Sequence, residues 1–141
     1  MLKIESIQDG IVIDHIPEGR GMEIYQLLHL KEQKQSVALL QSVRSQKYGH
    51  KDLIKIEGTT LPARLDILGY LDSNITLILI QNGQVSRKYH PVPPMYLKNV
   101  IKCQNPRCIT SIEKNCDHIF KMSPSGTYRC IYCHQEISVH S

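Results

Sequence analysis

The chain has 141 residues, of which 41% are hydrophobic and 21% charged, and its formal net charge is +4. This is an ordinary globular composition, and the length suits one medium domain or two small ones. No apolar run approaches the ~20 residues of a membrane-spanning helix, and the first residues contain no apolar signal core. We therefore expect a cytoplasmic protein with no membrane partner.

The first ninety residues alternate between strand-like and helix-like patterns. We expect strands over 2–8 and 11–16 around an Asp9-Gly10 turn, a helix over 20–31, strands over 36–43 and 53–57, a leucine-striped helix starting near Pro62, and strands over 75–80 and 84–90. Asn82-Gly83 is a strong hairpin signal between the last two strands. This order predicts an α+β fold, with a ferredoxin-like antiparallel sheet that carries two helices on one face.

The segment Pro91-Val92-Pro93-Pro94 ends this pattern. Three prolines in four residues remove backbone donors and stiffen the chain, as in a semi-rigid spacer. We therefore predict a first domain over residues 1–91 and a second domain over residues 95–141.

All five cysteines lie in this second part, as a C-x4-C pair, a single cysteine and a C-x2-C pair. In a reducing compartment, clustered cysteines indicate metal binding or catalysis rather than disulfides. Two such pairs supply the four soft ligands that tetrahedral Zn²⁺ prefers, and the last 47 residues are too few for a self-sufficient core. We predict one structural zinc ion per chain in a small antiparallel β domain, with the ligands Cys103, Cys108, Cys130 and Cys133.

The spacing leaves alternatives open. Iron also binds four thiolates, the cysteines could be unrelated to one another, and Cys116, His118 or His134 could replace one ligand. A zinc module with basic residues is also typical of nucleic-acid-binding proteins, here with Lys98, Lys102, Arg107, Lys114, Lys121 and Arg129. Residues 95–141 carry six Lys/Arg and three Asp/Glu, hence +3. Four thiolates with Zn²⁺ lower this to about +1, a weak basis for binding nucleic acid.

Polar residues also gather at strand ends in the first domain. Asp14 and His15 follow an apolar run, Lys51 and Lys55 flank the start of another strand, and Lys88 follows the hairpin. Such a set suits a phosphorylated ligand, but it is equally typical of solvated strand ends, which the spacing alone favours. No glycine-rich phosphate loop and no nucleophile–base pair supports an enzyme.

Several of these segments together resemble a known family, the regulatory chain of aspartate carbamoyltransferase. The resemblance is carried by residues 10–17 (GIVIDHIP), residues 49–57 (GHKDLIKIE), the two cysteine pairs, and Asn99-Val100 and Asn105 around the first pair. It covers residues 2–139 and is loose over 19–46 and 58–81. It implies a regulatory subunit in pyrimidine biosynthesis that has no catalytic activity of its own.

The resemblance also implies partners and effectors. The first domain would bind nucleoside triphosphates such as CTP or ATP and would pair regulatory chains as homodimers. The zinc domain would dock on the catalytic chain, so that regulatory chains bridge catalytic trimers. Nucleic acid would not be a partner.

Carried over position by position, the resemblance assigns a nucleotide site. Asp14 and Lys55 would contact the ribose, and His15 and Lys88 would face the phosphates, with Lys51 nearby. The backbone groups of Ile7 and Gly83 would meet the base edge. Ile78 stands where the family usually has an asparagine, and Gly83 stands where a tyrosine often follows the hairpin asparagine. Because isoleucine cannot replace the hydrogen bonds of an amide, we expect weaker base discrimination.

Overall fold

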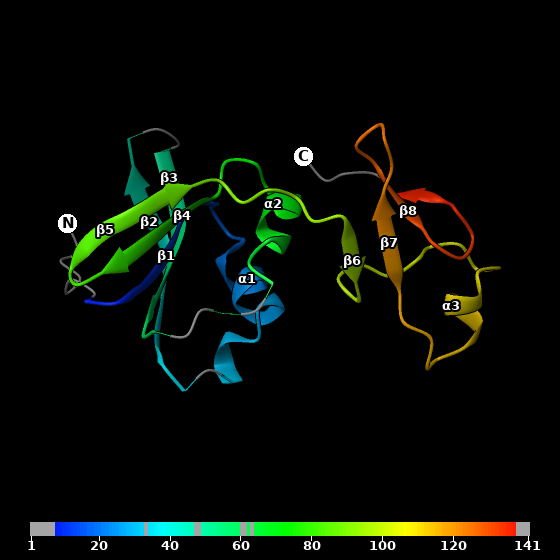
Figure 1. The fold of residues 1–141 in the computed structure, drawn as a ribbon, viewed down its shortest axis with the longest axis horizontal. Helices are drawn as coiled ribbons and strands as arrows, with labels where there is room; N and C mark the ends of the chain where they lie inside the picture. Colours follow the sequence, from blue (N-terminus) through cyan, green and yellow to red (C-terminus); the bar gives the residue numbers. More distant parts are fainter. Residues whose placement is uncertain (1–7, 33, 47–48, 60–61, 63, 138–141) are drawn as a thin grey trace. The chain divides into compact units, whose positions relative to one another are not determined.

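The computed structural model describes residues 8–32, 34–46, 49–59, 62 and 64–137. The chain divides into two compact units, Met1–Val92 and Pro93–Ser141 (Figure 1). No helix in the described part of the chain is both long and apolar enough to cross a membrane.

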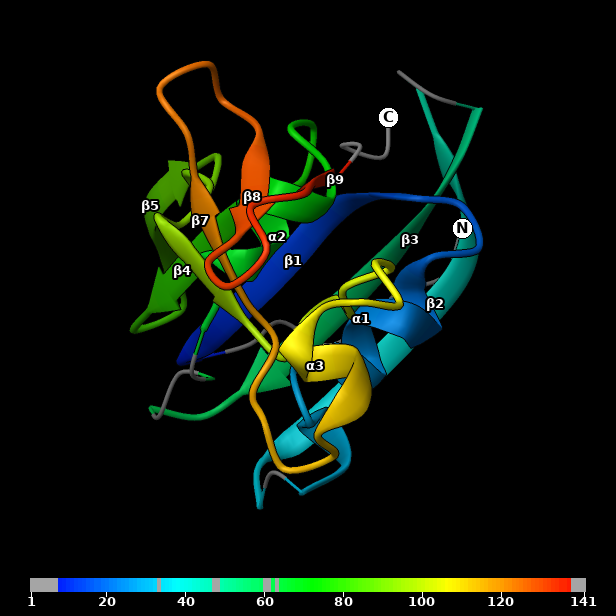
Figure 2. The same cartoon turned by 90° about the vertical axis from the view of Figure 1, so that its right-hand side faces the viewer.

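The first unit contains a five-stranded antiparallel sheet in the order β2-β3-β1-β4-β5. Its strands are β1 (Gly10–Pro17), β2 (Ser36–Ser45), β3 (Gly49–Glu57), β4 (Thr76–Gln81) and β5 (Gln84–Tyr89). The helices α1 (Gly21–Leu27) and α2 (Ile67–Leu71) lie on one face of this sheet (Figures 1 and 2). This is the ferredoxin-like order with β5 added at one edge, so the predicted α+β fold is confirmed.

Strand alternation gives the sheet two different faces. Ile11 and Ile13 of β1 and Ile54 of β3 are 0% exposed and belong to the helix-covered core. The alternate residues Val12 and Leu53 form a separate, smaller apolar cluster on the helix-free face, with Leu40, Ile78 and Ile80 packed against it. The helix-free face of the sheet is therefore partly apolar.

Asp52 is fully buried on the helix-covered face of β3. Its Oδ2 accepts hydrogen bonds from the backbone N–H of Gly19 at 3.1 Å and of Gly21 at 2.8 Å, and its Oδ1 accepts one from Ser42 at 3.0 Å. A Cβ on Gly21 would lie 2.8 Å from the same Oδ2, so only glycine fits there. The carboxylate thus ties β3 to the entry of α1 and to β2.

Both predicted helices are shorter in the structure. The helix expected over 20–31 ends at Leu27 and is followed by the 3₁₀ turn Leu30–Glu32, because His29 has a φ of 54°. The helix expected from Pro62 begins only at Ile67, after Arg64 with a φ of 63°. The strand expected over 2–8 lies outside the described residues except for Gln8, which forms a bend with Asp9.

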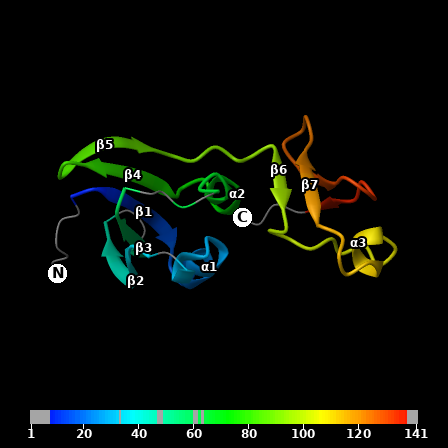
Figure 3. The same cartoon turned by 60° about the horizontal axis from the view of Figure 1, so that its bottom comes forward.

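The predicted hairpin between β4 and β5 is present (Figure 3). Asn82 and Gly83 form its two-residue loop with φ values of 53° and 75°. Two consecutive positive φ values are the requirement of a type I′ turn, which explains this dipeptide.

The second unit is a small four-stranded antiparallel sheet in the order β6-β7-β8-β9. Its elements are β6 (Tyr96–Lys98), α3 (Ile109–Ile112), β7 (Ile119–Met122), β8 (Tyr128–Cys130) and β9 (Glu136–Ile137) (Figures 1 and 2). Leu97 and Phe120 are 0% exposed, and the buried Tyr128 hydroxyl donates to the Pro94 carbonyl at 2.6 Å. These contacts form a small core beside the cysteine loops, and units of this size usually need a metal or disulfides in addition.

Candidate functional site

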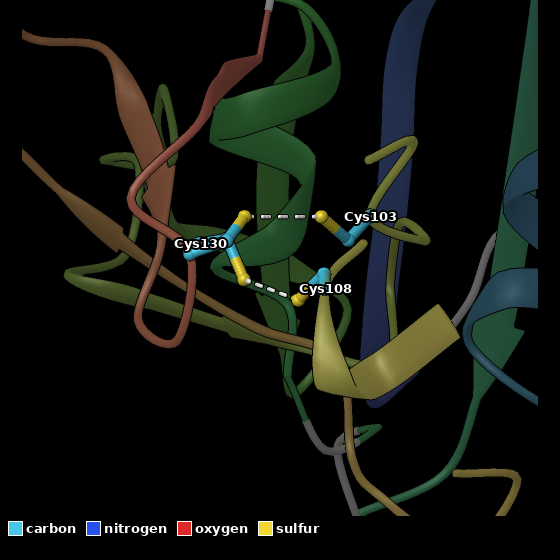
Figure 4. Close-up of side chains that lie close together, drawn as sticks. Cys103, Cys108 and Cys130 are labelled. Atoms are coloured by element: carbon cyan, nitrogen blue, oxygen red, sulfur yellow. Dashed lines mark hydrogen bonds between the residues drawn. The ribbon is translucent and has the colours of Figure 1, made fainter. Parts of the chain in front are cut away.

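The four paired cysteines converge in the second unit. The Sγ atoms of Cys103, Cys108, Cys130 and Cys133 all lie within 4.8 Å of one another. Cys103 Sγ is 3.6 Å from Cys133 Sγ, and Cys108 Sγ is 3.7 Å from Cys130 Sγ (Figure 4 labels three of the four residues). A tetrahedral ion with metal–sulfur bonds of ~2.3 Å has sulfur–sulfur edges of about 3.8 Å. The sulfurs are thus spaced for one metal ion and are too far apart for disulfides.

Two tight loops place these sulfurs. In the first loop, Cys108 N–H donates to the Asn105 carbonyl at 3.0 Å, and Arg107 N–H donates to Asn105 Oδ1 at 3.0 Å. In the second loop, His134 N–H donates to the Cys130 carbonyl at 2.9 Å. Each loop turns the chain so that both of its cysteines face the cluster. This turn explains why the cysteines occur as a C-x4-C pair and a C-x2-C pair.

The environment of the sulfurs is uneven. Burial raises the pKa of the Cys103 thiol to about 12 and also raises the pKa of Cys130. The Thr110 hydroxyl donates to Cys108 Sγ at 3.1 Å and lowers the pKa of Cys108 to about 6. Thiolates in such a buried place need a cation beside them, so the donor set fits a soft divalent metal.

The alternative ligands are not part of this cluster. Among the described residues, the group that could hold a metal consists of the four cysteines alone. The half-buried Cys116 thiol donates to the Asp117 carbonyl at 3.8 Å. His118 Nδ1 accepts the backbone N–H of Cys103 at 3.0 Å, which places it beside a cluster loop through the backbone.

In the first unit, a β-bulge presents Asp14 and His15. The pairing of β1 with β3 shifts register between Ile13 and Ile16, and His15 has a φ of 57°. Ile13 and Ile16 are both 0% exposed, while the two residues between them are half-buried. The bulge therefore keeps two adjacent polar residues out of the core.

Asp14 is held from two sides. Lys51 Nζ lies 2.7 Å from Asp14 Oδ1, and these side chains are 17% and 15% exposed, respectively. The same Oδ1 accepts the backbone N–H of His15 at 2.6 Å, and the His15 ring Nδ1 lies 3.1 Å from the Thr76 hydroxyl. Sequence reasoning missed Thr76, although its place at the start of a strand beside β1 is a usable signal.

Lys55 and Lys88 stand at the two ends of one row across the sheet. Lys55 of β3 lies opposite Val12 of β1, and Val12 lies opposite Ile78 of β4. Ile78 in turn lies opposite Lys88 of β5. Directly paired residues point to the same face, so two cations flank an apolar pair on the helix-free face. None of the ion pairs found in the described part of the chain includes either lysine.

The hairpin loop lies beside the start of β1. Gly83 N–H donates to the Gln8 carbonyl at 2.8 Å, and Asn82 N–H donates to Asp9 Oδ1 at 3.2 Å. The backbone N–H of Gly83 is therefore already used, whereas Ile7 lies outside the described residues. A base-edge contact from Gly83 would have to use its carbonyl.

A cavity of about 420 Å³ adjoins His15 and was not predicted from the sequence. Besides His15, its polar lining includes Glu18, His50, Asp72 and Asn74. These residues come from three separate segments, so no local sequence motif predicts the cavity.

Comparison with known proteins gives a consistent result over both units. Residues 2–92 match the family described as "Aspartate carbamoyltransferase regulatory chain, allosteric domain", and residues 96–141 match its "metal binding domain". A regulatory chain from Clostridium tetani is 44% identical over 135 residues, which cover 94% of both chains. Relatives of the same name from Clostridium botulinum and Bifidobacterium longum are 44% and 36% identical, over 94% and 96% of this chain and 92% and 98% of theirs.

Proposed function

Because this chain belongs to the family of aspartate carbamoyltransferase regulatory chains, which are non-catalytic subunits, we propose a division of work between its two units. Residues 1–91 bind nucleoside triphosphate effectors such as CTP or ATP. Residues 95–141 hold one structural zinc ion and dock on the catalytic chain of the pyrimidine-pathway enzyme. The alternative of a nucleic-acid-binding zinc ribbon has no support in the comparisons.

The spacing of the four sulfurs supports a single tetrahedral metal ion, for which we propose zinc. Cys103, Cys108, Cys130 and Cys133 would fill all four positions of a tetrahedral ion and leave none for water or substrate. The ion would clamp the two cysteine loops together and supply folding free energy of order 10–16 kcal/mol, as in zinc-finger peptides.

Metal analysis of the purified chain tests this assignment. We expect about one zinc per chain, lost when any of the four cysteines is changed to serine. Cys116→Ser is the matched control, because its thiol lies outside the cluster, and it should leave the zinc content unchanged. Zinc loss in Cys116→Ser together with zinc retention in Cys108→Ser would refute the ligand assignment.

The row of residues from Lys55 to Lys88 carries the nucleotide proposal. Its ends are about 14 Å apart at the Cα atoms, three strand spacings, so the flexible lysines reach different parts of one nucleotide. Lys55 and Asp14 serve the ribose, and Lys88 and His15 serve the triphosphate. Lys51 acts through Asp14, because its ammonium holds that carboxylate at 2.7 Å.

The apolar centre of this row bears on base selection. Ile78 packs against the Val12 cluster and presents no hydrogen-bonding group. The base therefore meets an apolar floor, and its edge is read only by backbone groups near Gly83 and Ile7. We expect CTP and ATP to bind with similar affinities, since side-chain recognition of the base edge is missing.

Calorimetry on the assembled complex tests the nucleotide site. Lys88→Ala should weaken binding of triphosphates more than binding of nucleosides, because Lys88 faces the phosphates. Lys55→Ala should weaken both, and Lys31→Ala, an exposed lysine of the 3₁₀ turn, should weaken neither. If neither CTP nor ATP binds the intact complex, the effector role is refuted and a purely structural bridge remains.

The partner of the second unit follows from the family name. We propose that regulatory chains pair through their first units in the cytoplasm and bridge catalytic trimers through their metal-bound second units. Holo and metal-stripped chains mixed with catalytic trimers, and sized by sedimentation velocity, test this. Only the holo chain should assemble, while both should still pair with themselves. Equal assembly by both would refute docking through the metal-binding unit.

A further inference from the structure

We infer that a cavity beside α3 in the second unit binds a small phosphate-bearing molecule. This site is separate from the nucleotide site proposed in the first unit, and it goes beyond the function proposed above. The cavity has a volume of about 600 Å³, which is within the range of small-molecule sites. Its walls come from the segment 99–103, from α3 and from the turn that follows α3, all within Pro93–Ser141. One ligand in this cavity would therefore contact three segments of the unit.

The uncompensated charges of this cavity are both positive. Lys102 and Lys114 line it, and neither belongs to an ion pair found among the described residues. The carboxylate of Asp117, also in the lining, accepts a hydrogen bond from Asn99 Nδ2 at 3.0 Å and lies 3.6 Å from Lys98 Nζ. These contacts lower the pKa of Asp117, and Lys98 balances its charge. Because a cleft lined by charge of one sign concentrates counter-ions, this cavity favours an anion.

Uncharged donors complete the lining. His118 Nδ1 accepts the backbone N–H of Cys103 at 3.0 Å, so the neutral ring carries its proton on Nε2 and offers that N–H as a donor. The side-chain amide of Asn115 also lines the cavity. The Ser111 hydroxyl is already used, because it donates to the Asn105 carbonyl at 2.7 Å. The cavity therefore offers two ammonium groups, an imidazole N–H and an amide.

This donor set suits a phosphate group better than a single carboxylate. A phosphate monoester carries about 1.5 to 2 negative charges at pH 7 and presents three terminal oxygens, whereas a carboxylate carries one charge on two oxygens. The two lysines balance such a dianion, since lysine binds phosphate as a compact point charge. The N–H groups of His118 and Asn115 supply further hydrogen bonds.

A bound phosphate would join two parts of the metal-binding unit. Lys102 directly precedes Cys103, the first proposed metal ligand, and Lys114 lies in the turn after α3. A dianion between these lysines links the approach to the cysteine cluster with the far end of α3. A ligand that binds only the folded state stabilises it by mass action, so occupancy should slow the loss of metal to a chelator. The second unit would then respond to a phosphorylated small molecule as well as holding the metal.

The thiol of Cys116 provides a reporter for this site. It is half-buried, lines the cavity and lies outside the four-cysteine cluster, so the metal would leave it available for alkylation. In the full-length holo chain, pyrophosphate should slow the alkylation of Cys116 by iodoacetamide about fivefold or more, in a saturable manner. Sodium chloride at the same ionic strength should not protect the thiol, and neither phosphate salt should change the alkylation of free N-acetylcysteine. Line broadening of inorganic phosphate in ³¹P NMR gives a second readout that does not depend on the thiol.

Charge-removing variants locate the site. Lys102→Gln/Lys114→Gln should raise the pyrophosphate concentration needed for protection at least about tenfold, because two charged contacts are lost. Lys121→Gln is the matched control, since Lys121 is an exposed lysine of β7 outside the cavity, and it should change that concentration less than about twofold. Each variant must retain one zinc per chain, and Lys114→Gln alone replaces the double variant if the latter does not.

The outcomes separate this site from the proposed nucleotide site. Absence of both thiol protection and phosphate line broadening in the wild-type chain would overturn the inference, as would equal protection in the wild type and the double lysine variant. Protection by citrate or by a single-stranded oligonucleotide, but not by pyrophosphate, would overturn the assignment to a small phosphate-bearing molecule. Lys88→Ala, which lacks a phosphate contact proposed for the first unit, should be protected like the wild type, and loss of protection there would also overturn the inference. A chain that shows this protection but binds neither CTP nor ATP would retain the phosphate site and lose only the effector role.

Discussion

Replacing Asp52 with alanine would remove the acceptor of three backbone N–H groups in the interior of the first unit. The donors belong to Gly19, Gly21 and Ser42, at 2.8–3.1 Å from a side chain that is 0% exposed. A hydrogen bond to a charged acceptor contributes about 1.5–3 kcal/mol, and a buried donor left without a partner costs about 1–3 kcal/mol. We therefore expect Asp52→Ala to lower the free energy of unfolding of this unit by at least about 4 kcal/mol.

Asp52→Asn offers a graded comparison. Its remaining oxygen can still accept from Gly19 and Gly21, but its NH₂ group then faces the N–H of Ser42. One hydrogen bond is lost and two donors meet, so we expect a loss of about 2 kcal/mol. The free energy of unfolding should therefore increase in the order Asp52→Ala, Asp52→Asn, wild type.

Urea unfolding with segment-resolved hydrogen exchange is the appropriate assay, because it reports on the two units separately. The amides of Gly19, Gly21 and Ser42 should lose protection first in Asp52→Ala, whereas in Asp52→Asn the loss should be confined to the amide of Ser42. Asp66→Ala is the control, since Asp66 is 45% exposed and its ion pair with Arg64 should contribute less than about 1 kcal/mol. An Asp52→Ala variant less than about 1 kcal/mol below that control would refute this account of how β3, α1 and β2 are joined.

Three further predictions concern the second unit. Because the pKa of Cys103 is raised to about 12, its thiol is protonated at neutral pH and zinc must displace that proton. Zinc affinity, measured by competition with a chelator, should therefore increase at least tenfold from pH 6.5 to 7.5. An affinity independent of pH would contradict this. Thr110→Val removes the hydroxyl that lowers the pKa of Cys108 to about 6, so alkylation of the metal-free thiols should require a higher pH, and an unchanged pH profile would count against this role. Tyr128→Phe removes the 2.6 Å hydrogen bond to the Pro94 carbonyl and should destabilise the unit by about 1 kcal/mol in thermal unfolding, whereas no shift would mean that water replaces the bond.

The sheet could be predicted from the sequence because each strand repeats its side chains with period two. Asp52 shows both the reach and the limit of this pattern. It shares a strand face with Ile54 and Ile56, so its burial follows from alternation. The hydrogen-bond partners of Asp52 could not be predicted in this way, because they come from segments 10 to 33 residues away and their N–H groups carry no sequence signature.

The helix ends were predicted less well for a local reason. His29 and Arg64 have left-handed φ values, which are uncommon for any residue except glycine, so the sequence does not mark either position as a helix boundary. In the second unit, the two cysteine spacings predicted a cluster, because a short loop brings its two ends together. The hydroxyl of Thr110 beside one of the sulfurs depends on how α3 begins, which spacing does not reveal.

The bulge in β1 limits which changes of length the strand can tolerate. A regular strand has one residue between neighbouring core positions, whereas β1 has two between Ile13 and Ile16, namely Asp14 and His15. Deleting either one would restore regular alternation and give a better-paired strand with an intact core. Selection for stability alone would favour that deletion. The bulge is therefore expected to persist only where both side chains contribute to function. Deleting Asp14 or His15, with stability and nucleotide binding measured separately, should raise stability and weaken binding.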